Sequence, residues 1–300
     1  MYIPKREDYR KIYELMNTAL TDDTGYALTT IAGWFAPYDC LVEVNDVYAL
    51  LSALADGKRR YISPLTASKE DYEEAVKAYE RMGVSEIIGV NSWQAEMLRA
   101  RGYEVTYNPD RSEYLYAPED LIGLQGGKYH SKRNFINRFE PKYEFRAYSP
   151  EDREGVMRLL CEWSYRHIDN GVRFCEQEGW IKYKDLEKVE VDEEIIVIDK
   201  VIKDLEGFNC FADVMEIDGK IAGFAAGEVL PNGIGALYFE KGDISYRGIY
   251  PTLDNLFCAK HFSSVRYINK QEDMGLEGLR KSKQSYYPVK MAERYTAVLK

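Results

Sequence analysis

The residues best placed for proton transfer are carboxylates that follow two expected strands. Glu240 lies at the end of the strand expected at 235–241, and Glu272 and Asp273 follow the strand expected at 265–269. In an open α/β sheet, ligands bind beyond the carboxyl ends of the strands. Transfer of an activated acyl group needs a positioned nucleophile, a proton acceptor and stabilisation of the developing oxyanion. Each of these carboxylates is a candidate to hold an amine or to take its proton.

Cations and hydrogen-bonding groups elsewhere in the chain are candidates to bind the substrate. Arginine and lysine pair with phosphates and carboxylates, and arginine does so through two parallel hydrogen bonds. Tyr286 is a further catalytic candidate, because its hydroxyl group can donate to an oxyanion or a leaving group. The predicted substrate-binding residues are Lys241, Arg247, Asn269, Arg280, Lys281, Lys132 and Arg133.

The same residue types have simpler structural roles, which the sequence leaves open. Glu272 and Asp273 would favour the N-terminal dipole of a helix expected at 276–285, and Arg280 and Lys281 would favour its C-terminal end. The remaining charged candidates would then lie on solvated surfaces.

Histidine, cysteine and net charge restrict the chemistry and the partners. The three histidines have no metal-ligand spacing, and the five cysteines are scattered without a C-x-x-C motif. We therefore predict no metal site and reduced intracellular thiols. A net charge of −10 argues against DNA as a partner, because backbone phosphates repel an acidic chain. A local basic patch could still contact RNA or an anionic headgroup.

Length and hydropathy limit the architecture. The chain has 300 residues, of which 45% are hydrophobic, and this is enough for two domains with substantial cores. Its first residues are charged, unlike a signal peptide, and it has no run of about 18 apolar residues. We therefore expect no transmembrane segment and a cytoplasmic protein. The 25 tyrosines suit half-buried strand positions, and a tyrosine-lined cleft is the alternative.

The N-terminal half, residues 1–125, is predicted to be a sheet with flanking helices. Ser68 should cap its second helix, whose acidic first turn suits the helix dipole. The last two strands flank Asn108-Pro109-Asp110, which predicts a hairpin. The pattern predicts helices at 5–20, 69–82 and 93–101, and strands at 40–44, 47–54, 60–65, 85–90, 103–107 and 113–116.

The C-terminal half, residues 126–300, repeats this order of elements after a basic linker helix at 126–140. Asp218-Gly219 predicts a tight turn between two strands, and the charged stretch 167–190 is an excursion or a short helix with a loop. The pattern predicts strands at 143–148, 210–217, 220–230, 235–241, 265–269 and 289–299, and helices at 150–165, 193–205, 251–262 and 276–285.

The residues before the helix that begins at Pro251 bear on binding of an acyl-coenzyme A. A helix N-terminus suits an anion because of its free N–H groups and its dipole. Arg247-Gly248 is a remnant of the usual acetyl-coenzyme A loop, Arg/Gln-x-x-Gly-x-Gly/Ala, but Ile249 and Tyr250 replace the second glycine. The bulky side chains of Ile249 and Tyr250 should obstruct the close approach of a pyrophosphate, and Pro251 has no N–H group to donate to it.

The densest run of polar residues lies at 267–288 and carries several short motifs in order. These are Asn269, Glu272-Asp273, Gly275-Leu276-Glu277-Gly278-Leu279-Arg280-Lys281 and Ser285-Tyr286-Tyr287-Pro288, preceded by Lys132–Phe139 and Phe239–Asp243. With these motifs, residues 126–300 resemble the C-terminal domain of phosphatidylglycerol lysyltransferase, which a family of uncharacterised bacterial proteins shares.

The resemblance implies a fold and a class of reaction. The lysyltransferase, or lysylphosphatidylglycerol synthase, is similar to GNAT acyltransferases, in which three antiparallel strands, a crossover helix and another strand follow one another. The resemblance implies two tandem GNAT-like α/β (α+β) domains, 1–125 and 126–300. Each is expected to be a mixed, mostly antiparallel sheet with flanking helices, and the first domain is expected to be degenerate. The named synthase moves lysine from lysyl-tRNA to phosphatidylglycerol.

Three functions remain as alternatives. The first is a GNAT-like acyltransferase that transfers an aminoacyl group to an unknown acceptor, with an aminoacyl-tRNA held by the basic surface around Lys128, Lys132, Arg133 and Arg138. The second is an acyl-CoA-dependent N-acetyltransferase. The third is a non-catalytic ligand-binding or interaction module that keeps the GNAT fold.

Overall fold

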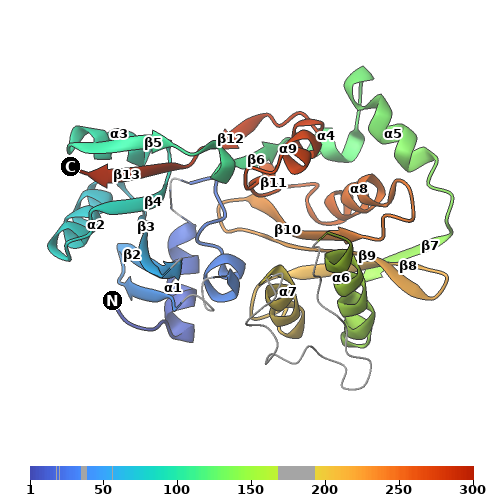
Figure 1. The fold of residues 1–300 in the computed structure, drawn as a ribbon, viewed down its shortest axis with the longest axis horizontal. Helices are drawn as coiled ribbons and strands as arrows, with labels where there is room; N and C mark the ends of the chain where they lie inside the picture. The colour runs from blue at the N-terminus through green and yellow to red at the C-terminus, as the bar shows by residue number, and fades with distance from the viewer. Residues whose placement is uncertain (18, 20, 35–38, 56, 168–192) are drawn as a thin grey trace. The chain divides into compact units, whose positions relative to one another are not determined.

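The chain falls into two compact units, and each combines strands with flanking helices (Figure 1). The charged stretch predicted at 167–190 lies outside the described residues, except for its first residue. Unit 1 consists of Met1–Ala117, Val229–Ala236 and Arg266–Lys300, and unit 2 consists of Pro118–Glu228 and Leu237–Val265. The computed structural model describes residues 1–17, 19, 21–34, 39–55, 57–167 and 193–300.

Unit 1 contains a six-stranded sheet with the order β1-β2-β3-β4-β13-β5. Only β3 and β4 pair in parallel, and every other neighbouring pair is antiparallel. Figure 1 shows β13, from the C-terminus, between β4 and β5. This part of the fold is therefore a mixed, mostly antiparallel sheet, as predicted. The strands are β1 (Leu41–Val44), β2 (Tyr48–Ala55), β3 (Lys58–Thr66), β4 (Glu86–Val90), β5 (Tyr103–Tyr107) and β13 (Tyr295–Leu299).

Helices α2 (Lys69–Arg81) and α3 (Ser92–Ala100) bury their apolar residues in the core of this sheet. Ser68 caps α2 as predicted, because its side chain accepts the Asp71 N–H at 3.1 Å. Fully buried Tyr79 reaches from α2 into the sheet, where its hydroxyl group lies 2.8 Å from a backbone carbonyl oxygen of β2 and from one of β3 and can donate to either. The other helical segments of this part are α1 (Arg6–Met16), a π-helical turn at Thr29–Trp34 and a 3₁₀ turn at Pro109–Arg111.

Unit 1 also contains strands β6, β11 and β12. β6 lies between the other two and is antiparallel to both, while β11 pairs in parallel with the first residues of β10. This parallel pairing ends at Asn269, the last residue of β11. The elements are β6 (Glu113–Tyr116), β11 (Tyr267–Asn269), α9 (Glu277–Gln284) and β12 (Lys290–Ala292).

Two predicted strand arrangements in unit 1 are wrong. The hairpin expected between β5 and β6 does not form, because β5 pairs with β13, and β6 pairs with β11 and β12. The backbone N–H of Asn108, just after β5, donates instead to Arg294 O at 2.8 Å. The single strand expected at 289–299 is two strands, β12 and β13, which belong to different sheets. The partner in each case is distant in sequence, so local turn signals could not reveal it.

Unit 2 contains β7 (Tyr143–Ala147), β8 (Phe211–Ile217) and most of β9 (Lys220–Val229) and β10 (Ile234–Gly242). β8 pairs antiparallel with both β7 and β9, and β10 follows β9. Asp218 and Gly219 have φ values of 51° and 74° and form the tight turn predicted between β8 and β9.

Helices cover both faces of the unit 2 strands. Figure 1 shows α6 and α7 on one face and α8 on the other. α8 also packs against α4 and α5, and the Asn255 side chain of α8 donates to the carbonyls of Leu121 and Ile122 at 2.8 Å each. The helices are α4 (Pro118–Gly123), α5 (His130–Asn137), α6 (Arg153–His167), α7 (Glu193–Lys203) and α8 (Ile249–His261), with 3₁₀ turns at Gly127–Tyr129 and Pro150–Asp152.

Candidate active site

The end of β10 in unit 2 brings a carboxylate close to a tyrosine hydroxyl group. Glu240 is half-buried there, and Tyr250 lies in the first turn of α8. Burial, reinforced by the negative charge of Glu240, raises the pKa of Tyr250 to about 12. The hydroxyl group therefore keeps its proton at neutral pH. Its oxygen accepts a hydrogen bond from Trp163 Nε1 of α6 at 3.0 Å, so its proton can be donated to a ligand.

Lys241 supports this arrangement from the other side of the strand. Its side chain is only 9% exposed, and Nζ lies 2.6 Å from Glu194 Oε2 of α7. Nζ also lies 4.0 Å from the centre of the Trp163 ring, which is favourable cation–π geometry. The ion pair thus fixes the Lys241 ammonium group, which lies over the Trp163 ring, and Trp163 Nε1 donates to the hydroxyl group of Tyr250. Binding of substrate by Lys241 itself stays a prediction.

The approach to the N-terminus of α8 is narrowed by α5. Gly248 caps α8 with a φ of +98°, and a Cβ added there would lie 2.9 Å from Phe135 O. The exposed guanidinium group of Arg247 lies 5.5 Å from the centre of the Phe135 ring. The remnant of the coenzyme A loop therefore packs on α5.

Few backbone donors remain at this helix end. Ile249, the first helical residue, already donates its N–H to Tyr246 O at 3.1 Å. Pro251, the third, has no N–H. Of the first three helical residues, which the structure describes, only Tyr250 keeps an N–H group without such a backbone bond, whereas a pyrophosphate site uses several N–H groups together.

The basic surface before and on α5 is largely engaged with the protein itself. Arg133 donates to Leu124 O and, at 2.8 Å, to Gly126 O. Lys128 Nζ lies 3.3 Å from Asp120 Oδ2. Lys132 is half-buried on α5 and also has a partner. These contacts hold the turn that leads into α5, and the roles predicted for Lys132 and Arg133 in substrate binding remain untested.

Asp273 in unit 1 is surrounded by donors. Its carboxylate is fully buried and accepts from Tyr114 Oη at 2.6 Å, from Arg280 Nε and Nη2 at 2.8 Å each, and from the Gly275 N–H at 2.9 Å. Hydrogen bonding to Arg280 holds the pKa of Asp273 well below its usual range. A carboxylate with four donors and a lowered pKa is a poor proton acceptor. The geometry thus favours a structural role for Asp273 in the turn before α9.

The other predicted residues of unit 1 are dispersed. Glu272 lies 3.2 Å from the exposed Arg111, and Lys281 pairs with Glu277 of α9 at 2.6 Å, where both side chains are exposed. Tyr286 is buried, and its ring lies 4.8 Å from Lys270 Nζ. None of these contacts forms a shared site, so their predicted roles rest on the sequence motifs alone.

A buried polar network in unit 1 was missed by sequence reasoning. The Arg294 guanidinium lies 2.8 Å from Glu113 Oε1 and 3.0 Å from Asp23 Oδ2. Glu113 also accepts from Asn269 Nδ2 at 2.6 Å and from the backbone N–H of Thr24 at 3.0 Å. Asn269, predicted to bind substrate, therefore connects β11 to this network. The charges come from three distant parts of the chain, so no local motif marks them.

Trp163, Glu194 and Tyr250 were likewise absent from the predicted site, although Glu240 and Lys241 beside them were present. Each lies on a different helix of unit 2, and no motif links them in sequence. Within the described part of the chain, no group of histidine, cysteine and acidic residues could hold a metal ion. Nor is any helix of that part long and apolar enough to cross a bilayer.

The mixed sheets with flanking helices have the fold of tandem GNAT-like proteins. A tandem GNAT protein from the clavulanic acid biosynthesis pathway superposes with a TM-score of 0.51 and 13% identity, over 99% of this chain and 97% of that one. The family follows from the sequence itself. The model described as "Phosphatidylglycerol lysyltransferase, C-terminal" matches residues 18–298, and the chain belongs to that family. Family and fold together support a GNAT-like acyltransferase.

Other proteins are also similar to this chain in fold or in sequence. A conserved protein of unknown function from Bacteroides thetaiotaomicron has a TM-score of 0.84 at 24% identity, covering 99% of this chain and 98% of that one. The C-terminal domain of a putative lysylphosphatidylglycerol synthetase from Agrobacterium fabrum has a TM-score of 0.68 at 14% identity, covering 98% of this chain and 92% of that one. An uncharacterised protein of Mycoplasmoides gallisepticum is 26% identical over 186 residues, which is 61% of this chain but only 55% of that relative.

Proposed function

We propose that the chain transfers an aminoacyl group from an ester donor, with aminoacyl-tRNA as the donor class, to an acceptor that carries a nucleophilic amine or hydroxyl group. Membership of the lysyltransferase family and the GNAT-like fold support acyl transfer. The observation that carries the choice of donor is the closed N-terminus of α8. Gly248 lies against Phe135 O, and Pro251 has no N–H group to donate, so this helix end is poorly suited to bind a coenzyme A pyrophosphate.

The end of β10 supplies groups suited to this reaction. The acyl carbon forms a bond to the acceptor, and the ester bond to the ribose oxygen breaks. Glu240 is proposed to take the proton that the acceptor loses, or to hold the ammonium group of the aminoacyl moiety. The protonated hydroxyl group of Tyr250 is proposed to donate to the departing ribose oxygen, with Trp163 holding it in place. Cytoplasmic location and a tRNA contact through α5 belong to the same proposal.

A transfer assay with labelled aminoacyl-tRNAs tests the proposal. The full chain is incubated with tRNAs charged with each amino acid, and loss of the ester and labelled products are followed with an extract of bacterial metabolites and lipids as acceptor source. Glu240→Gln should lower the rate by about 10²–10⁴-fold, the usual contribution of general acid–base catalysis. Glu144→Gln, an exposed carboxylate on β7 of the same unit, is the matched control and should leave the rate unchanged.

Two results would count against the proposal. If no aminoacyl ester is consumed faster than without protein, the donor class is wrong. If calorimetry instead shows saturable micromolar binding of acetyl-coenzyme A, the acyl-coenzyme A alternative replaces it. If neither donor is used and Glu240→Gln alters no measured binding, the non-catalytic module is the better description.

A further inference from the structure

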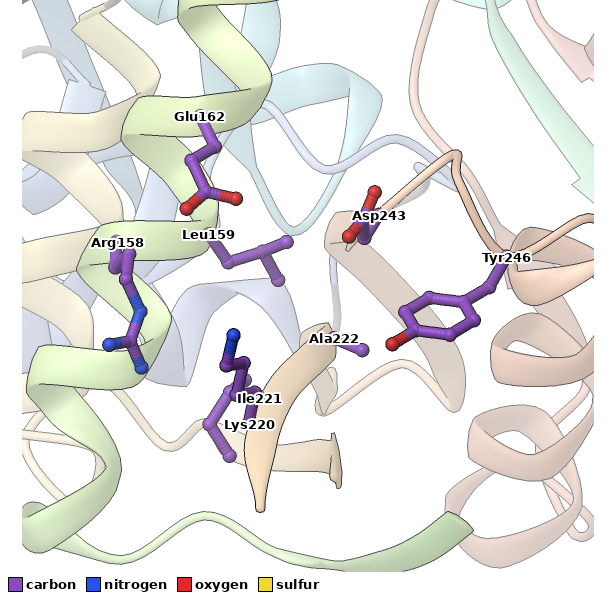
Figure 2. Close-up of a pocket in the computed structure, with 8 residues that line it drawn as sticks. All are labelled: Arg158, Leu159, Glu162, Lys220, Ile221, Ala222, Asp243 and Tyr246. Atoms are coloured by element: carbon purple, nitrogen blue, oxygen red, sulfur yellow. The ribbon is translucent and has the colours of Figure 1, made fainter. Parts of the chain in front are cut away.

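A separate pocket in unit 2 lies between α6, the first residues of β9 and the loop after β10 (Figure 2). Its volume is about 190 Å³, which is below the roughly 300–1,000 Å³ of pockets for drug-sized ligands. A nucleotide or a coenzyme A is too large for it. The buried side chains of Leu159 and Ala222 form an apolar part of its lining, and charged side chains form much of the rest.

Close packing of α6 on β9 builds one wall. A Cβ added at Gly155 would lie 2.7 Å from Ile221 Cγ1, so the glycine lets the helix approach the strand closely. Arg158 and Glu162 follow Gly155 by three and seven residues and therefore project from the same face of α6. This spacing brings a cation and a carboxylate to the pocket from one helix.

The loop after β10 builds the opposite wall. The Asp243 N–H donates to Ala222 O at 2.8 Å, which ties the loop to β9. The backbone N–H of Ser245 donates to Asp243 Oδ1 at 3.0 Å and orients the carboxylate. Tyr246, three residues after Asp243, extends its ring across the pocket. Asp243 is thus held in position by the backbone before any ligand arrives.

The charges of the pocket are separated by sign. In the view of Figure 2 the carboxylates of Glu162 and Asp243 lie on one side, and the Lys220 ammonium and Arg158 guanidinium groups lie on the other. Among the described residues, Arg158, Glu162 and Lys220 form no ion pair and no side-chain hydrogen bond. Glu162, Arg158 and Lys220 therefore offer charges of both signs to a ligand, beside the Asp243 carboxylate that Ser245 orients.

We propose that this pocket binds a free α-amino acid. The ammonium group of the ligand lies toward Glu162 and Asp243, its carboxylate lies toward Arg158 and Lys220, and its side chain contacts the apolar lining. A ligand that carries only a negative charge would be attracted by the two cations but repelled by the two carboxylates. A ligand that carries only a positive charge would be attracted by the carboxylates but repelled by the cations. The charge arrangement thus favours a zwitterion over a ligand that carries only one of its two charges.

Calorimetric titration of the full chain with each of the common L-amino acids tests the site. The Kd should lie near 1 mM or below, so titration to about 10 mM is sufficient. Propionate and propylamine, which each carry one of the two charges, should bind at least about tenfold more weakly. Glu162→Gln and Arg158→Gln should each weaken amino-acid binding by about tenfold or more. Glu154→Gln, an exposed carboxylate of α6 outside the pocket, is the control and should have no effect.

Several results would overturn the proposal. These are the absence of saturable binding for every amino acid, binding of propionate as tight as that of the amino acids, and amino-acid binding that Glu162→Gln and Arg158→Gln leave unchanged. The measurement is independent of the proposed transferase reaction. Binding that responds to Glu162→Gln but not to Glu240→Gln supports the pocket even if no transfer is found.

Discussion

Replacement of Arg294 by methionine should destabilise the protein strongly. Arg294 is 7% exposed and lies 3.0 Å from Asp23 and 2.8 Å from Glu113, and it also donates to Gly89 O at 3.2 Å. Methionine keeps much of the side-chain length but leaves two buried carboxylates without their cation. Removal of one partner from a buried ion pair costs about 3–5 kcal/mol. The free energy of unfolding should fall by about this amount.

Urea unfolding at neutral pH measures the loss. Arg81→Met is the matched control, because Arg81 pairs with Glu74 at 3.2 Å but both side chains are more than half exposed. An exposed ion pair contributes about 0–1 kcal/mol, so the two variants should differ by at least about 2 kcal/mol. Equal losses in the two variants would refute the assignment of Arg294 to a buried network.

The pH dependence provides a second check on the same network. Burial already raises the pKa of Glu113, and Arg294 opposes that rise. Without the arginine, the pKa of Glu113 in the folded state should rise further above its unfolded value of about 4. A carboxyl group with a raised folded pKa favours the folded state at low pH. The deficit of Arg294→Met should therefore shrink as the pH falls from 7 toward 4, and a constant deficit would contradict the argument.

Two further predictions concern unit 2. Gly248→Ala should destabilise the protein by at least about 1–2 kcal/mol, because Gly248 has a φ of +98° and an added Cβ would contact Phe135 O. Thermal unfolding measures this loss. The control is Gly278→Ala on the open surface of α9, which should be neutral or stabilising. The hydrogen bond from Arg146 lowers the pKa of Asp152 to about 2, so the stability that Asp152→Asn removes is present above about pH 4 and is lost as the pH falls toward 2. The free energies of unfolding of the unsubstituted protein and of Asp152→Asn, measured as the pH is lowered, should converge over that interval. A constant difference between them would contradict this reasoning.

The sequence by itself determined the family, the GNAT-like class and most of the elements. Local signals were sufficient for the cap at Ser68 and for the turn at Asp218-Gly219, because capping and turn conformations depend on neighbouring residues. The motifs at 269–288 were sufficient for the family. The predicted domains, 1–125 and 126–300, stay a prediction.

Tertiary structure decided the pairing of distant segments and the environment of each charge. It placed β13 between β4 and β5, and it enclosed Arg294 between Asp23 and Glu113. It also showed that donors saturate Asp273, whereas Glu240 lies beside a protonated tyrosine hydroxyl group. Sequence patterns report periodicity and local propensity, but burial, and therefore pKa and hydrogen-bond partners, depends on contacts between residues far apart in the chain.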